Sequence, residues 1–121
     1  MMKTVTITKD NFESTIAEND VVFFDFWASW CGPCRFFAPI FEAAAEKHPD
    51  IVFGKIDTEA QPELAQALRI SSIPTVMAFK EQIGIMAQPG ALPAEAFEDV
   101  IEQVKKLDMD EVRKELEAQQ A

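Results

Sequence analysis

The chain has 121 residues, of which 48% are hydrophobic and 26% charged, and it carries a formal net charge of −10. These values are ordinary for one globular domain that buries roughly two-thirds of its unfolded surface. Nucleic acid and anionic membrane surfaces would repel so acidic a protein, and we therefore exclude both as expected partners.

The first half of the chain predicts two strands and two helices. Residues 3–8 alternate as in a short half-buried strand, and a helix is expected over residues 10–18. Residues 21–27 are nearly all apolar, which indicates a central strand covered on both faces. A helix then runs from 33 to about 47, and Pro39 inside it should kink it.

The second half predicts a further alternation that ends in a hairpin and a helix. The expected elements are a strand at 51–57, a helix at 62–68, strands at 75–79 and 85–88 with a turn at 81–84, and an amphipathic helix at 94–106. This order, βαβαβ followed by ββα, predicts an α/β fold. A mixed central sheet would have parallel helix-joined strands, an antiparallel late hairpin and flanking helices.

Residues 107–121 predict a C-terminal helical extension to a domain formed by residues 1–106. Asp108 with Glu111 resembles a capping box at its start. Three apolar residues share one helical face: Met109, Val112 and Leu116. Two interpretations stay open, a tail helix that rests on the domain or frays, and a helix that docks a partner.

The only two cysteines stand in Trp30-Cys31-Gly32-Pro33-Cys34, where the central strand meets the following helix. On a helix these thiols would lie on one face about one turn apart and could close a small disulfide. A helix N-terminus has unpaired backbone N–H groups and a dipole that favours negative charge, so it stabilises a thiolate. Cys-X-X-Cys beside a βαβ pattern indicates a thiol–disulfide redox site.

Two other interpretations of the cysteine pair are half of a zinc site and an inert pair of buried thiols. Zinc usually needs four ligands, and His48 is the only further soft donor, so we expect no metal. His48 itself is expected on the surface near a helix C-terminus, where the dipole favours it.

The string from Asp25 to Cys34, followed by Ile73-Pro74-Thr75 and Gly90-Ala91, resembles the thioredoxin family from about residue 5 to 106. The resemblance implies the thioredoxin fold and a protein-disulfide reductase that works by dithiol–disulfide exchange without a cofactor. It also implies disulfide-containing client proteins and a thioredoxin reductase as partners. A monomer is the default expectation.

The resemblance assigns roles to the cysteine motif. Cys31 is expected to be the nucleophile, because a thiolate rather than a thiol attacks disulfides. Cys34 is expected to resolve the mixed disulfide in a fast intramolecular step. Gly32 allows a tight turn, and Pro33 fixes φ at the helix start.

Asp25 interrupts an apolar strand, and burial should raise its pKa. A carboxylate that titrates near neutrality can take the proton from Cys34, and the resemblance implies this role. It also implies that Lys55 lies near Asp25 and tunes it. The alternatives are an Asp25 that is merely hydrogen-bonded at a strand end and a Lys55 whose head lies in water.

The resemblance further implies a groove that binds substrate by strand addition. The Ile73–Pro74 bond is expected to be cis and to face the cysteines, with Ile73 offering backbone hydrogen bonds. Trp30, Gly90 and Ala91 are expected to complete the apolar rim. Core packing is the alternative for Trp30.

A cytoplasmic thiol–disulfide oxidoreductase is therefore the first functional hypothesis. Two cysteines at this spacing suit a reducing compartment, and residues 1–10 lack the apolar centre of a signal peptide. The alternative is a binding or adaptor module of the same fold with incidental redox activity. An oxidase or isomerase is disfavoured by the Gly32-Pro33 pair.

Overall fold

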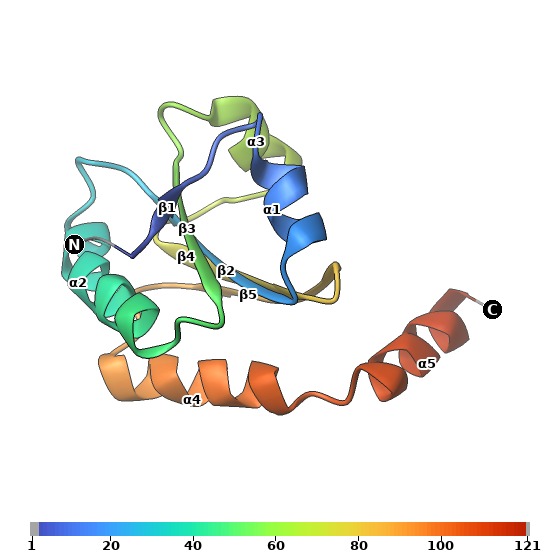
Figure 1. The fold of residues 1–121 in the computed structure, drawn as a ribbon. Helices are drawn as coiled ribbons and strands as arrows, with labels where there is room; N and C mark the ends of the chain where they lie inside the picture. The colour runs from blue at the N-terminus through green and yellow to red at the C-terminus, as the bar shows by residue number, and fades with distance from the viewer. Residues whose placement is uncertain (1–2, 121) are drawn as a thin grey trace.

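The computed structural model describes residues 3–120 and shows one mixed five-stranded sheet, in the order β1-β3-β2-β4-β5 (Figure 1). The elements are β1 (Val5–Thr6), α1 (Phe12–Glu18), β2 (Val21–Trp27), α2 (Gly32–Lys47), β3 (Val52–Asp57), α3 (Pro62–Ala67), β4 (Thr75–Lys80), β5 (Ile83–Pro89), α4 (Ala94–Lys106) and α5 (Met109–Gln120). Strand β3 runs parallel to β1 and β2, whereas β4 runs antiparallel to β2 and β5. The predicted α/β fold is confirmed. Residues 1, 2 and 121, which the predicted domains and N-terminal segment include, lie outside the described residues.

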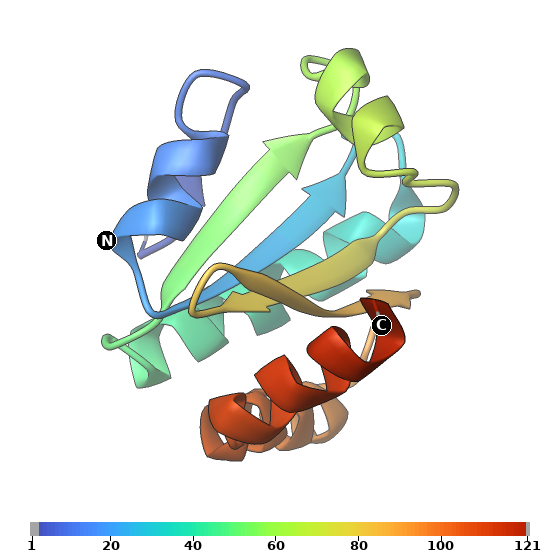
Figure 2. The same ribbon diagram turned by 90° about the vertical axis from the view of Figure 1, so that its right-hand side faces the viewer.

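Helices cover both faces of the sheet, α1 and α3 on one and α2 and α4 on the other (Figures 1 and 2). Successive side chains of β2 point to opposite faces. Val21 and Phe23 enter the core beneath α2 and α4, while Val22, Phe24 and Phe26 enter the core beneath α1 and α3. This double burial is the reason that the central strand is apolar at nearly every position.

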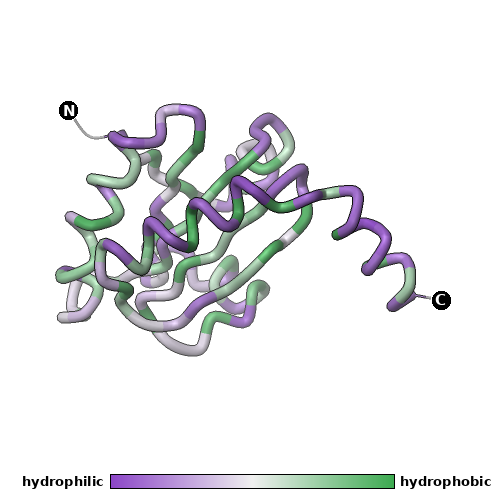
Figure 3. The backbone as a smooth tube through the Cα atoms, turned by 90° about the horizontal axis from the view of Figure 1, so that it is seen from below, coloured by the Kyte–Doolittle hydropathy of each residue, from purple (hydrophilic) through white to green (hydrophobic). Residues whose placement is uncertain are grey.

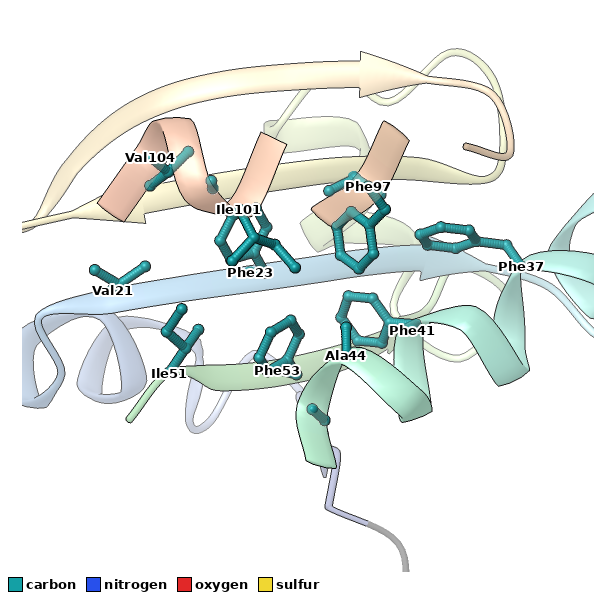
Figure 4. Packing of buried hydrophobic residues seen from close by; sticks show 13 residues of the cluster. Val21, Phe23, Phe37, Phe41, Ala44, Ile51, Phe53, Phe97, Ile101 and Val104 are labelled. Carbon is teal, nitrogen blue, oxygen red and sulfur yellow. The ribbon is translucent and has the colours of Figure 1, made fainter. Parts of the chain in front are cut away.

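Aromatic rings dominate the core between the sheet, α2 and α4 (Figure 4). Phe23 stacks on Phe53 with ring centroids 5.7 Å apart, and Phe97 meets Phe37 edge-on at 5.2 Å. Such pairs contribute about 0.5–1.5 kcal/mol each beyond area burial. Phe37 lies in the second turn of α2, so this packing fixes the helix end that carries Cys31.

The turn between β4 and β5 is tighter than predicted. Strand β5 begins at Ile83, which pairs with Lys80, so the loop is only Glu81 and Gln82. Both loop residues have positive φ angles, 50° and 68°. Two consecutive loop residues with positive φ angles are usually Asn-Gly, so the residue types Glu81 and Gln82 did not indicate such a turn. The prediction that β5 starts at residue 85 was therefore wrong.

Lys80, at the end of β4, is a buried lysine that the sequence did not single out. Its Nζ donates hydrogen bonds to the carbonyl oxygens of Val104, Lys105 and Leu107, at 3.0, 2.8 and 3.1 Å. The last carbonyls of a helix have no intrahelical partner, and a cation there also meets the negative end of the dipole. Lys80 thus fixes the C-terminus of α4 to the sheet.

Helix α5 follows α4 after Leu107 and Asp108 and extends to one side of the sheet (Figure 1). Asp108 Oδ1 accepts hydrogen bonds from the backbone N–H groups of Asp110 and Glu111, as expected of the predicted cap. Met109 is buried, and α5 is largely hydrophilic beyond it (Figure 3). Its first turns rest on the domain.

His48 was predicted to be a surface residue, and this is wrong. Its side chain is buried, and Nε2 lies 2.9 Å from Oε2 of Glu98 on α4. His48 does end α2, and its backbone N–H donates to the carbonyl of Ala44. Packing of α4 beside the end of α2, which local sequence does not encode, covers the ring.

Within residues 3–120, none of the helices combines the length and apolar character that a membrane crossing requires.

Candidate redox site

Cys31 and Cys34 form a disulfide at the N-terminus of α2, with Cα atoms 5.2 Å apart. Cys31 is the N-cap residue with an extended backbone, and Cys34 lies in the first turn. Pro33 stands at one of the first two helical positions, where its missing N–H removes no intrahelical hydrogen bond. The pair therefore lies at the strand–helix junction where the sequence predicts it.

The backbone around the disulfide favours negative charge on Cys31. Its Sγ accepts a hydrogen bond from the N–H of Cys34 at 3.2 Å, in addition to the field of the helix N-terminus. Both cysteines are buried, 4% and 3% exposed, among Ala28, Trp27 and Ile73. Burial disfavours an anion, and the donated N–H and the helix dipole oppose this effect at Cys31.

Asp25 is fully buried on β2, and neither carboxylate oxygen has a hydrogen-bond partner within residues 3–120. Val22 and Phe24 point to the face of the sheet that α1 and α3 cover. Asp25 points to the opposite face, which α2 covers, because successive side chains of a strand alternate between faces. Burial raises the pKa of Asp25 from 3.8 to about 7, against the opposing attraction of Lys55. The alternative of a carboxylate hydrogen-bonded at a strand end is wrong.

Lys55 is the partner of Asp25 in the β2–β3 ladder and projects to the same side of the sheet. Its Nζ lies 5.2 Å from the centroid of the Trp27 ring, which is a cation–π geometry. A cavity of about 500 Å³, whose lining includes Trp27, Lys55 and Asp57, reaches this cluster from β1 and β3. The structure therefore brings Asp25 and Lys55 together beside an opening to solvent.

One loop from outside α2 meets the disulfide, and a second loop is joined to the first. The Ile73–Pro74 bond is cis, as predicted, and the carbonyl oxygen of Ile73 lies 3.7 Å from Sγ of Cys31. Pro74 accepts a hydrogen bond from the N–H of Gly90 at 2.8 Å, which joins the two loops. Gly90 has φ +96°, a region that favours glycine.

Trp30 lies on the surface beside the disulfide with 66% of its area exposed, so the alternative of core packing is wrong. Its indole N–H donates to Oε1 of Glu59 at 3.2 Å. Gly32 is also exposed, whereas Ala91 is half-buried against the core beneath α2 and α4. The predicted rim thus consists of an exposed part at Trp30 and a partly covered part at Ala91.

Sequence reasoning assigned no role to two residues that shape this surface. Glu59 fixes Trp30, and Arg35 Nη1 donates to the carbonyl of Ser29 at 2.9 Å, which braces the turn before Cys31. The carboxyl ends of parallel strands meet at one edge of a sheet. Glu59 follows β3, so this rule could have indicated that Glu59 lies near the cysteines.

Within the described part of the chain, no group of three or more His, Cys, Asp or Glu could hold a metal ion.

Comparison with known proteins gives concordant matches. A family model described as Thioredoxin matches residues 3–103. The protein named Putative thioredoxin 2 of Streptomyces coelicolor is 62% identical over 121 residues, which cover 100% of this chain and 90% of that protein. Thioredoxin-1 of Saccharomyces cerevisiae is 38% identical over 87 residues, which cover 72% and 84% of the two chains. The solved structure of a mutant thioredoxin from Halobacterium salinarum has a TM-score of 0.81 at 30% identity, covering 87% and 93%.

Proposed function

Because this chain belongs to the thioredoxin family and is a thiol–disulfide oxidoreductase that acts through Cys31 and Cys34, we propose that Cys31 is the nucleophile and Cys34 the resolving thiol. One observation carries this assignment. Sγ of Cys31 lies at the N-cap of α2 and accepts the N–H of Cys34 at 3.2 Å. That donor stabilises a thiolate on Cys31 and leaves Cys34 without the same benefit.

The reduction then proceeds in two exchanges. The Cys31 thiolate attacks one sulfur of a substrate disulfide, that S–S bond breaks, and the second substrate sulfur leaves as a thiolate that takes up a proton. Cys34 loses its proton and attacks Sγ of Cys31, which releases the first substrate sulfur as a thiolate. Two electrons have passed from the cysteine pair to the substrate, and the Cys31–Cys34 disulfide of the structure is the product.

Asp25 is our proposed acceptor for the Cys34 proton. A general base works best when its pKa lies near the working pH, and burial holds the pKa of Asp25 at about 7. Lys55 keeps part of this carboxyl ionised by its positive charge. The cavity that reaches Lys55 and Trp27 gives water a route by which the proton can leave.

The substrate segment is proposed to lie across the exposed loops. The carbonyl of Ile73 lies beside Cys31 and can accept an N–H from an extended chain that adds to this edge. Trp30 offers a large exposed apolar surface next to it, while Gly32, Pro33, Pro74, Gly90 and Ala91 supply backbone and small side chains around the disulfide.

Disulfide-containing proteins are the substrates of this family, and a thioredoxin reductase is the electron donor that it implies. We further propose a monomer that works in the cytoplasm without metal or organic cofactor. Residues 1–106 would be the catalytic domain and 107–121 an extension, since the family match ends at residue 103 and α4 at Lys106. The alternative of a binding or adaptor module is not favoured, because it would give the Cys31–Cys34 pair of this family no essential role.

The test is turnover of a small protein disulfide with a dithiol donor, for the unchanged protein and for Cys31→Ser and Cys34→Ser. Both variants should lose turnover. Only Cys34→Ser should accumulate a mixed disulfide with substrate, detected by mass spectrometry, because its nucleophile remains. A mixed disulfide trapped instead by Cys31→Ser would reverse the assignment of the two roles.

A further inference from the structure

The outer face of α2 carries an apolar stripe that leads away from the disulfide. Phe36 is 59% exposed although its neighbour Phe37 is fully buried. Ile40 and Ala43 follow Phe36 at spacings of four and seven residues, which places all three on one face of the helix. A single exposed apolar side chain is common on protein surfaces, but Phe36 lies one helical turn before Ile40, which lines a groove.

The groove lies between α2 and α4, which cover the same face of the sheet (Figures 1 and 2). It has a volume of about 200 Å³ and receives Pro39, Ile40 and Ala43 from α2. Ala94 and Glu98 come from α4. Its walls are therefore mostly aliphatic, and Phe36 stands at the end nearer the cysteines.

The far end of the groove is acidic. An adjoining hollow of about 330 Å³ is lined by Ala94, Glu95, Glu98, Asp99 and Lys47. Glu98 is engaged by His48 at 2.9 Å, which leaves Glu95 and Asp99 as exposed carboxylates that outweigh the one lysine. The net charge of −10 on the whole chain adds to this negative potential.

We propose that this α2–α4 groove, with Phe36 at its mouth, is a second docking surface for protein disulfide substrates that carry an apolar and then a basic residue on one side of the reactive cysteine. The proposal rests on the proposed function and names the substrate class of that same site. The position of Phe36 on α2, between Cys31 and the residues that line the groove, and the charge complementarity of the acidic far end support it. A second contact point raises the effective concentration of the substrate disulfide at Cys31.

Helix geometry fixes the spacing that such a substrate needs. Phe36 lies about 7.5 Å along the helix axis from Cys31, and Lys47 about 24 Å. An extended chain covers these spans with about two or three and about seven or eight residues. The apolar residue should therefore stand about three positions from the reactive cysteine and the basic residues about seven or eight.

The probe is a peptide whose single cysteine forms a mixed disulfide with thionitrobenzoate. A tail of about eight residues starts at this cysteine. Counted from the cysteine, the tail carries leucine at position three and arginine at positions seven and eight. Peptides with the tail before or after the cysteine cover both directions, and an equally long Gly-Ser tail is the reference. Release of thionitrobenzoate reports kcat/KM. The apolar–basic tail in one direction should raise kcat/KM on the order of tenfold at low salt.

Two variants should abolish this gain, Phe36→Ser and the double variant Glu95→Gln with Asp99→Asn. The matched control, Glu13→Gln with Glu18→Gln on α1, removes the same charge from the opposite face of the sheet and should keep the gain. Every variant should reduce dithiobis-nitrobenzoate, which has no tail, at the unchanged rate. An unchanged rate with this compound would show that the fold and the disulfide chemistry of the variant are intact.

The outcomes separate the inference from the function on which it rests. If the unchanged protein fails to reduce dithiobis-nitrobenzoate, the proposed function fails. If it reduces that compound but gains nothing from the tail in either direction, the groove does not dock substrates. A gain that survives in both groove variants would place the tail elsewhere and overturn the inference as well.

Discussion

Lys55 stands opposite Asp25 in the β2–β3 ladder, and its ammonium lies 5.2 Å from the centroid of the Trp27 ring. Asp25 has no hydrogen-bond partner among residues 3–120, so Lys55 and burial are the two influences on its charge. Burial is the stronger and raises the pKa of Asp25 to about 7. This balance sets the pH range in which Asp25 can take up a proton.

Replacing Lys55 by methionine should raise the pKa of Asp25 further, because the only attraction that lowers it is lost. The ionised fraction at pH 7 then falls, and reduction at that pH should slow severalfold, whereas activity at higher pH recovers. The measurement is the pH dependence of kcat/KM for a protein disulfide. Lys9→Met, at an exposed position, is the control. Superimposable profiles for Lys55→Met and the unchanged protein would remove Lys55 from the mechanism.

Asp25→Asn should stabilise the fold above neutral pH. The folded-state pKa of about 7 exceeds the ordinary value of 3.8, so the folded protein binds the extra proton and its stability falls as pH rises between these values. The full penalty is about 4 kcal/mol, which the variant avoids. Urea unfolding at pH 8 and pH 4 checks this, with a gain expected only at pH 8. An equal gain at both values would mean that Asp25 titrates normally.

Gly54→Ala should destabilise the sheet. A Cβ atom at Gly54 would stand 2.5 Å from Cγ1 of Ile7 and 3.0 Å from a ring carbon of Phe24, and both neighbours are fully buried. Overpacking of this kind costs about 1–3 kcal/mol. Thermal unfolding measures the loss, with Gly32→Ala as the matched control, since a Cβ atom at Gly32 meets nothing within 4 Å. Unchanged stability of Gly54→Ala would show that Ile7 moves aside freely.

Lys80→Met should loosen the end of α4. The variant keeps the aliphatic stem but leaves the carbonyls of Val104, Lys105 and Leu107 without their donor, at a cost of about 2–3 kcal/mol. Chemical unfolding measures this cost, and amide hydrogen exchange should show faster opening of α5. The control is Lys106→Met, because Lys106 is an exposed residue in the last turn of α4. Similar small effects for both lysines would contradict the role of Lys80.

Local sequence was sufficient wherever a short stretch carries the information. The nearly continuous apolar run of β2 predicted burial on both faces, and the 3.6-residue spacing of Phe97, Ile101 and Val104 predicted the buried face of α4. Cys31 and Cys34 needed only a strand followed by a helix to lie at a helix N-terminus. The cap at Asp108 is likewise a contact between residues two and three positions apart.

Only the tertiary structure decided the contacts between residues distant in the chain, including the burial of Lys80 and His48. Lys80 finds its carbonyl partners 24 to 27 positions later, and His48 meets Glu98 50 positions away. Phe36 and Phe37 are adjacent and identical in type, yet packing of α4 against α2 buries one and leaves the other exposed. The sequence by itself determined the elements and the redox pair, because hydrogen bonds and side-chain periodicity within one element are local. Burial and electrostatics depend on elements distant in the chain, and these set the charge of Asp25 and the shape of the groove beside α2.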